Sequence, residues 1–361
     1  MAEVPTLEAA VQAVHVLNND PNPANKAAAN EWLTGFQESP HAWTVADAML
    51  HAEGLPMQAT FIAVQTLRSK MKRDFNELPP ESQLALRDSV MAHLLKFKAG
   101  PQIMITQVAL SLADFAVQCA QWIDTVPHIM GSLGDDPAAM PCLLEVIKVL
   151  PQEIDNEELN VHRGRRHDFA MQIGAHFRDI SSFLCQCFEQ CGGAGPMAHK
   201  IIECYTAWLN VCPHDVSMDE VATNPLIPVV FQALSNEEMF DAGVDCICYL
   251  LYMSRLDSSS DLAGILVPNV MGLRELQAQI FAAGEDAEEQ ARGITRIFVE
   301  LGEAHMRFVQ TATPDALQVC EAVLACGYHD SPKISKMPFD FWSAAPNDTN
   351  QPQVYVLTEH V

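Results

Sequence analysis

Cysteines give the chain its nearest approach to a metal-binding pattern. Cys185 and Cys187 flank Gln186 and precede Cys191, and Cys246 and Cys248 flank Ile247. On a helix, residues two positions apart point about 200° away from each other, so neither pair can converge on one ion. No second CxxC or HxxxH pattern completes a ligand set. The spacing predicts structural cysteines in a helical core and no metal site.

Two further clusters could bind ligands. The run Gly192-Gly193-Ala194-Gly195 lacks the preceding strand and the following Lys-Ser/Thr of a phosphate loop, so we expect a turn. The segment His162–His167 (HRGRRH) is the densest basic cluster, and it follows a stretch without helical spacing. We expect a solvated loop or intrachain ion pairs there, and a site for an acidic partner is the alternative.

Catalytic residues do not stand out. The thirteen histidines and the many acidic residues are scattered without the spacing of a Ser–His–Asp, Cys–His or paired-carboxylate site. We therefore expect no enzyme activity and no cofactor.

Amphipathic helices of ten to twenty residues fill most of the chain and follow one another in pairs. Apolar residues recur at i, i+3, i+4 and i+7, whereas no segment of comparable length alternates with period two. Clear examples are Ile105–Ala116, Met140–Pro151, Lys200–Val211, Gly243–Met253 and Ile294–Glu303. One pair cannot bury its apolar stripe alone, but a stack of pairs can. The pattern predicts an all-α fold, an α-solenoid (superhelix) of HEAT-like helical hairpin repeats.

Proline and glycine mark where the helices begin and end. They divide the first 150 residues into four pairs of about 38 residues each, close to the length of HEAT and armadillo units. The second helices of these pairs are expected at about 24–38, 57–75, 102–118 and 139–150. Longer loops are expected at about 151–165, 191–197, 212–224 and 254–261.

Charge limits the possible partners. The formal net charge is −25, from 21 Lys and Arg against 46 Asp and Glu. Nucleic acid and anionic membranes would be repelled, so we expect neither as a partner, while a basic protein would be attracted. The alternative is a surface whose charge only keeps the chain soluble. The first residues, MAEVPTLEAAVQ, do not resemble a secretory signal, which predicts reduced cysteines in the cytosol or nucleus.

The first 100 residues carry a more specific set of motifs. These are Asp20-Pro21-x-Pro23, Ala29-x-x-Trp32-Leu33, Ser39-x-x-Ala42-Trp43, Phe61-x-Ala63-x-Gln65-Thr66-Leu67, Lys70-x-Lys72 and Phe75-x-Glu77-Leu78-Pro79. Together they resemble the N-terminal domain of the importin-β superfamily, and most closely its transportin-SR type. Weaker matches, such as Leu143-Leu144-Glu145 and Phe339-x-Phe341-Trp342, extend the resemblance to about residue 342.

The resemblance implies a nuclear import receptor. Family members are HEAT solenoids more than twice this long that hold Ran in its GTP form through their N-terminal repeats, bind nucleoporin FG repeats, and shuttle between cytoplasm and nucleus through the pore. Transportin-SR relatives hold Arg/Ser-rich cargo largely through a C-terminal half that the resemblance does not reach. We therefore expect a truncated form that keeps Ran binding best. The alternative is a general HEAT scaffold subunit unrelated to Ran.

Domain boundaries follow from the same resemblance. We expect an importin-β N-terminal-like domain at 1–100, further HEAT-like repeats at 101–343, and a divergent, disordered tail at 344–361. If the stack ends after Trp342, the last helix should expose an apolar face and favour weak self-association.

Four polar residues on the second helices are candidate Ran contacts, because these helices line the concave face of a HEAT stack. They are Gln65, Lys72, Asp114 and Glu145. The alternative for each is a hydrogen bond that fixes the register between repeats. Trp32, Trp43 and Phe61 are assigned to packing between helices.

Overall fold

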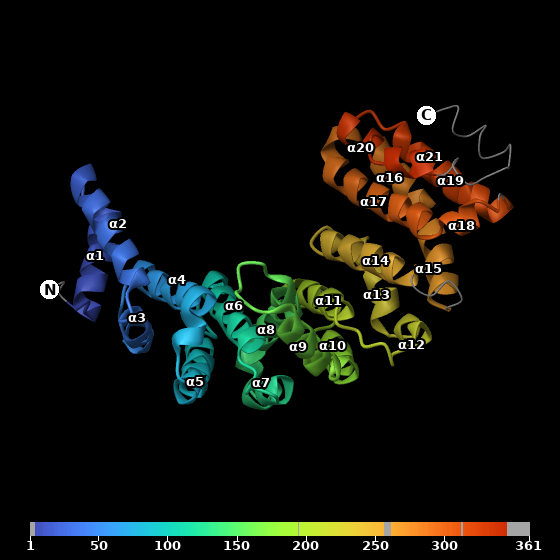
Figure 1. Ribbon diagram of the computed structural model, residues 1–361. Helices are drawn as coiled ribbons and strands as arrows, with labels where there is room; N and C mark the ends of the chain where they lie inside the picture. Colours follow the sequence, from blue (N-terminus) through green and yellow to red (C-terminus); the bar gives the residue numbers. More distant parts are fainter. Residues whose placement is uncertain (1–3, 194, 256–260, 312, 345–361) are drawn as a thin grey trace. The chain divides into compact units, whose positions relative to one another are not determined.

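A computed structural model describes residues 4–193, 195–255, 261–311 and 313–344, and the regular structure within these ranges is entirely helical. The chain divides into two compact units, Met1–Ile180 and Ser181–Val361. Helical hairpins stack side by side within each unit (Figure 1), which confirms the predicted HEAT-like all-α solenoid. The expected tail at 344–361 lies, apart from Ala344, outside the described residues, as does most of the expected loop at 254–261.

The first unit contains four helical hairpins followed by a ninth helix. Its helices are α1 (Leu7–Asn19), α2 (Pro23–Glu38), α3 (Ala42–His51), α4 (Met57–Asp74), α5 (Pro80–Lys96), α6 (Gln102–Gln118), α7 (Thr125–Leu133), α8 (Met140–Gln152) and α9 (Arg163–Gly174). Short 3-10 turns lie at η1 (Phe75–Glu77), η2 (Pro137–Ala139) and η3 (Glu153–Asp155). The second helices α4, α6 and α8 pack against one another in chain order, as Figure 1 shows.

Helix starts in the first unit follow from local chemistry. The Thr6 hydroxyl accepts a hydrogen bond from the Ala9 amide, and the Asn22 side chain accepts one from the Ala24 amide. These contacts satisfy amide groups that a helix start leaves without partners. Pro23 and Pro80 occupy the first turns of α2 and α5, where a missing N–H costs nothing. Proline therefore separates the helices, and the expected second-helix ranges agree closely with α2, α4, α6 and α8.

The second unit repeats the hairpin arrangement with shorter first helices. Helix α10 (Phe177–Gln190) crosses the boundary between the units, and the helices after it are α11 (Gly195–Leu209), α12 (Met218–Ala222), α13 (Leu226–Ala233), α14 (Phe240–Ser254), α15 (Asp261–Met271), α16 (Arg274–Ala282), α17 (Glu288–Ala304), α18 (Met306–Val309), α19 (Pro314–Gly327), α20 (Pro332–Ser335) and α21 (Phe339–Ala344). A 3-10 turn, η4 (Gly284–Ala287), precedes α17. The packing order is α11, α14, α17 and α19. Helix α12 lies inside the expected loop at 212–224, because the Ser217 side chain caps a single helical turn.

Two glycines of α17 allow close packing in the second unit. A Cβ atom on Gly293 would lie 2.6 Å from Phe240 Cε1, and one on Gly302 would lie 2.6 Å from Phe341 Cε2. Both distances are shorter than van der Waals contact, so only glycine lets these two rings approach the helix. Phe341 and Trp342 are buried there, while Phe339 is exposed.

Cysteine thiols lie in or near the core rather than in a ligand set. Cys187 and Cys246 are buried, and Cys185, Cys191 and Cys248 are half-buried. Burial raises the pKa of both Cys246 and Cys248 to about 12, so both are neutral thiols near pH 7. Neutral thiols are poor metal ligands, since metals bind the thiolate.

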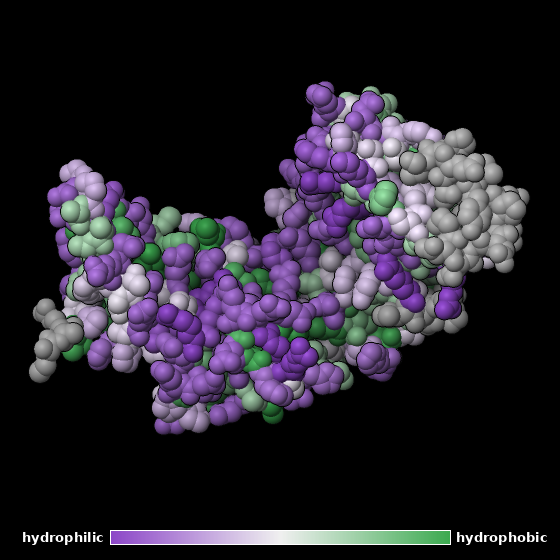
Figure 2. Space-filling model, turned by 45° about the horizontal axis from the view of Figure 1, so that its top comes forward, coloured by the Kyte–Doolittle hydropathy of each residue, from purple (hydrophilic) through white to green (hydrophobic). Residues whose placement is uncertain are grey.

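Hydrophilic residues cover most of the surface seen in Figure 2, and hydrophobic residues show there as small separate patches. None of the described helices combines the length and the apolar character that crossing a membrane requires.

Candidate partner-binding face

Helices α4, α6 and α8 present polar side chains along neighbouring stripes of the first unit. We call this side of the three helices, with the side chains that lie at and beneath its surface, the binding face. We define it by Gln65, Arg68 and Lys72 on α4, Asp114 on α6, Glu145 and Lys148 on α8, and the following segment 153–162. Positions 65, 68 and 72 are three and four residues apart, so they share one side of α4. The binding face contains all four sequence-predicted site residues, and the structure distributes them between surface and interior.

Gln65 and Lys72 are the accessible ones among the four predicted site residues. Gln65 is exposed, and Lys72 is partly exposed. The Lys72 ammonium forms an ion pair with the Glu158 carboxylate, 86 residues later in the chain. This ion pair and its hydrogen bond hold the pKa of Glu158 below its usual range. Lys72 therefore presents a fixed positive charge at the surface, beside an acidic segment.

Asp114 is buried, which favours the alternative of a hydrogen bond between helices over a direct partner contact. Its Oδ2 accepts a hydrogen bond from Arg68 Nε at 2.8 Å, and Arg68 Nη2 lies 3.5 Å from Glu153 Oε1. One guanidinium therefore joins α4, α6 and η3. Burial, followed by the neighbouring Glu153 carboxyl, raises the pKa of Asp114 to about 7, and Arg68 opposes this shift. Asp114 fixes the packing of the helices and has no exposed surface.

Glu145 is also buried and joins α6 to α8. Its carboxylate accepts hydrogen bonds from Thr106 Oγ1 at 2.9 Å and from Gln102 Nε2 at 3.1 Å. Lys148 Nζ lies 3.4 Å from the same carboxylate. Three donors compensate the burial of one charge, as a buried carboxylate requires. As for Asp114, the structure favours the alternative for Glu145, a hydrogen-bonded link that holds two helices together.

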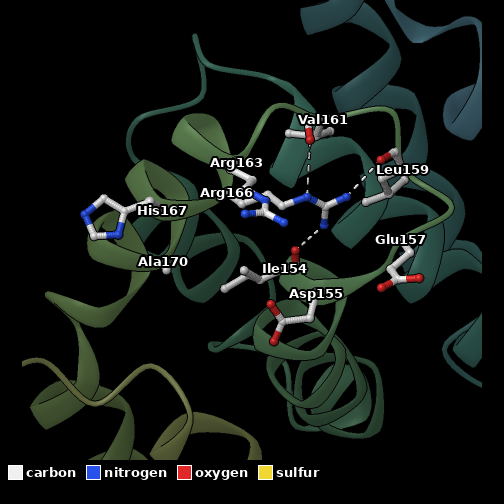
Figure 3. Close-up of a pocket in the computed structure, with 9 residues that line it drawn as sticks. All are labelled: Ile154, Asp155, Glu157, Leu159, Val161, Arg163, Arg166, His167 and Ala170. Carbon is white, nitrogen blue, oxygen red and sulfur yellow. Dashed lines mark hydrogen bonds between the residues drawn. The ribbon is translucent and has the colours of Figure 1, made fainter.

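Arg166 organises the segment that follows α8. Its Nη2 donates to the Asn156 carbonyl at 2.7 Å and to the Leu159 carbonyl at 2.8 Å, and its Nε donates to the Val161 carbonyl at 3.3 Å. A further hydrogen bond reaches the Ile154 carbonyl. Figure 3 shows the guanidinium among the carbonyl oxygens of Ile154, Leu159 and Val161, in a pocket between the segment and α9. Because carbonyl groups take up its donors, Arg166 stabilises the segment and is not a free anion site.

The neighbouring Arg165 acts on α6. Its Nη2 donates to the carbonyls of Ala116 at 2.9 Å and Cys119 at 3.1 Å, at the C-terminal end of that helix. A cation at this position satisfies carbonyl groups that the helix end leaves unpaired. The basic cluster is therefore not the expected loop, because Arg163–His167 lie at the start of α9, and Arg165 and Arg166 bond to backbone carbonyls.

Arg68, Glu153 and Glu158 also belong to the binding face, although the sequence analysis did not identify them. Arg68 could have been found, since it lies three residues after Gln65 and four before Lys72 on the same stripe. The two glutamates could not, because their partners lie on helices more than 80 residues away in the sequence. The ring of Trp32, assigned to packing, stacks on Phe36 of its own helix at 5.6 Å between centroids, and about a third of the residue stays exposed.

Three family models match most of the chain. Residues 29–96 match the importin-beta N-terminal domain, residues 101–247 match the exportin 1-like protein family, and residues 285–353 match the second TPR domain of transportin-3 and importin-13. The chain is 28% identical to transportin MOS14 of Arabidopsis thaliana over 341 residues, which is 92% of this chain and 35% of that protein. It is 28% identical to human importin-13 over 312 residues, covering 84% of this chain and 31% of that protein. The chain thus spans about a third of the length of these relatives.

Proposed function

Because the chain belongs to the importin-β superfamily, we propose that it is a nuclear transport receptor whose first unit binds Ran in its GTP form through the binding face. Members of this superfamily are transport receptors and not enzymes, so we propose no catalytic activity for this chain. One observation carries the proposal: the importin-beta N-terminal domain match covers residues 29–96, which include the whole of α4 with Gln65 and Lys72.

Gln65 and Lys72 are the residues of the binding face that we propose contact Ran. Both lie on α4 and are accessible, and Lys72 brings a positive charge to an otherwise acidic chain. Asp114 and Glu145 contribute indirectly, because they set the spacing of α4, α6 and α8. If the partner contacts more than one of these helices, loss of Asp114 or Glu145 would weaken its binding although the partner touches neither side chain.

The segment 153–162 provides the binding face with a carboxylate, that of Glu158, which a partner could displace from Lys72. The Glu158 side chain is largely exposed, while the side chain of its partner Lys72 is only partly exposed. A partner carboxylate could replace Glu158 on Lys72, since an exposed ion pair of this kind contributes only about 0–1 kcal/mol. Arg166 would hold the rest of the segment in place during this exchange.

The proposal extends to cargo and location. A net charge of −25 favours basic cargo, including Arg/Ser-rich proteins, and nucleoporin FG repeats complete the set of proposed partners. A receptor with these partners would shuttle between cytoplasm and nucleus through the nuclear pore.

Nucleotide-dependent binding tests the proposal. The full chain, immobilised and shown to be helical by circular dichroism, is exposed to Ran loaded with a non-hydrolysable GTP analogue or with GDP. We expect retention of the GTP form at least tenfold above the GDP form. Equal retention of both forms, or no retention by the folded chain, would contradict the proposal, and stable capture of another protein regardless of nucleotide would favour a general scaffold.

A further inference from the structure

Three potential metal ligands meet between the first helices of two neighbouring hairpins. Asp47 and His51 lie one turn apart on α3, and His93 lies on α5. The oxygen and nitrogen atoms that each could offer to an ion lie within 4.8 Å of one another. Among the described residues, this is the one grouping of at least three His, Cys, Asp or Glu side chains with such geometry.

Two of the ligands are already held in position. His93 is buried, and its Nε2 lies 2.9 Å from Asp47 Oδ1. The Ser89 hydroxyl donates to the same carboxylate oxygen. His51 Nδ1 lies 3.4 Å from the other carboxylate oxygen, and its ring meets that of His93 edge-to-face, with centroids 4.4 Å apart. His51 Nδ1 also lies 3.0 Å from the backbone carbonyl oxygen of Asp47. The three side chains therefore face one another, and a shared ion would replace the hydrogen bonds that their ligand atoms now make.

We propose that Asp47, His51 and His93 bind a divalent transition-metal ion, with Zn²⁺ as the fitting species, and that this ion joins α3 to α5. Zinc bonds of about 2.0–2.2 Å place neighbouring tetrahedral ligand atoms about 3.3–3.6 Å apart. The separations in the cluster, from 2.9 Å up to 4.8 Å, lie on both sides of this range. Two imidazoles and one carboxylate favour zinc over calcium or magnesium, which prefer oxygen ligands, and leave a fourth position for water.

The surroundings also favour a cation. Helix α3 ends at His51, so the negative end of its dipole points toward the cluster. Asp47 and His51 are partly exposed and give an ion access from solvent, whereas His93 anchors the site from inside. Lys96, one turn further along α5, already places an ammonium at this end of α3, where it donates to the carbonyls of Leu50 at 2.6 Å and Ala52 at 2.8 Å. It opposes part of the attraction of the helix end but leaves the Asp47 carboxylate to the two histidines.

The site is separate from the binding face. It lies on α3 and α5, the first helices of their hairpins, whereas the binding face lies on the second helices α4, α6 and α8. A metal ion between α3 and α5 would stabilise the junction of the second and third hairpins. Loss of the metal should therefore change stability and leave nucleotide-dependent Ran binding in place, so the two proposals can fail independently.

Metal titration of the purified full chain tests the inference. Zn²⁺ binding is measured calorimetrically, and Co²⁺ serves as a spectroscopic probe, for the wild type, His51→Ala and Asp47→Asn. We expect one ion per chain, a higher unfolding temperature with Zn²⁺, and at least tenfold weaker binding in both variants. The Co²⁺ complex should show visible d–d bands without a thiolate charge-transfer band, because the site contains no cysteine.

His41→Ala is the matched control, because His41 is an exposed histidine immediately before α3 and lies outside the cluster. It should bind both ions like the wild type. Equal loss of affinity in His41→Ala and His51→Ala, a thiolate band with Co²⁺, or no saturable binding by the folded chain would overturn the inference. The last outcome would leave an Asp–His hydrogen-bonded pair as the whole role of the cluster.

Discussion

The two units of the chain join similar hairpins by different chemistry. In the first unit, buried ionisable side chains link successive second helices: Arg68 reaches Asp114 and Glu153, and Glu145 joins α6 to α8. In the second unit, glycines of α17 let Phe240 and Phe341 pack directly against the helix backbone. Among the residues whose burial the structure describes, every buried Asp, Glu and Lys lies in the first unit.

This difference distinguishes contacts that specify one arrangement of the helices from contacts that only stabilise the fold. Apolar contacts between helices are non-directional, and they stabilise the fold through the apolar area that they bury. Buried charges add little net stability but are strongly destabilising when one partner is removed, so they favour one arrangement of the helices. The first unit, which carries the binding face, would thus hold its helices in a more defined register. The second unit also has ion pairs between α14 and α17, but they are partly exposed, so we expect this unit to be more sensitive to changes in volume than to changes in charge.

The largest expected effect comes from removing the shared cation of the first unit. Arg68→Met should lower the free energy of unfolding of this unit by about 3 kcal/mol, because it leaves Asp114 and Glu153 without a positive partner. Hydrogen exchange followed by mass spectrometry, read on peptides from α4 and α6, measures the loss. The double variant Arg68→Met with Asp114→Leu should recover more than half of the lost unfolding free energy. No recovery would argue against a link between α4 and α6 that depends on charge.

The second unit should respond to volume instead. Gly302→Ala places a methyl group against the Phe341 ring and should cost about 1–3 kcal/mol of unfolding free energy, measured by urea denaturation. Gly264→Ala is the control, since no atom lies within 4 Å of its Cβ position on α15. It should be neutral or stabilising by up to about 1 kcal/mol. Equal effects of both variants would contradict the close-packing account.

Asp114 should give the first unit a pH dependence. Burial and Glu153 raise the pKa of Asp114 to about 7 in the folded chain, so between pH 4 and 7 the folded state binds a proton that the unfolded state releases. The contribution of this group therefore favours folding at low pH and is lost as the pH rises through 7, by up to about 1.4 kcal/mol per pH unit. Asp114→Asn should remove this slope in urea denaturation repeated across the pH range. An unchanged slope would exclude Asp114 as its source.

The smallest effect is expected for the exposed ion pair of the binding face. Lys72→Ala should change the free energy of unfolding by less than about 1 kcal/mol, and the change should shrink further in high salt. Thermal unfolding at two salt concentrations measures this. A loss above 2 kcal/mol would mean that Lys72 is a structural residue rather than an available contact.

Helix boundaries were the most predictable part of the fold. Proline positions and apolar spacing placed α2, α4, α6 and α8 within one or two residues of their observed ends, because these signals are local. The structure of the segment 151–165 was not predictable. It depends on Arg165 and Arg166, whose acceptors are backbone carbonyls that only the folded chain brings together.

The burial of individual candidate site residues could not be predicted from the sequence either. All four are polar residues within otherwise apolar helices, and the spacing that selected Gln65 and Lys72 selected Asp114 and Glu145 as well. Exposure depends on the neighbouring hairpin, which covers Asp114 and Glu145 and leaves Gln65 open. A polar residue on such a helix therefore either contacts a partner protein or links two helices of the chain. Only the packing of the neighbouring hairpins distinguishes the two roles.

Comparing two charge reversals tests the central claim most directly. Lys72→Glu and Lys333→Glu change the net charge equally, and both lysines pair with a glutamate, but Lys333 lies on α20 in the second unit. The affinity of each variant for Ran loaded with a GTP analogue is measured at one ionic strength. The account predicts at least tenfold weaker binding, or about 1.4 kcal/mol, for Lys72→Glu and a wild-type affinity for Lys333→Glu. Equal affinities of the two variants would contradict a Ran site on the binding face.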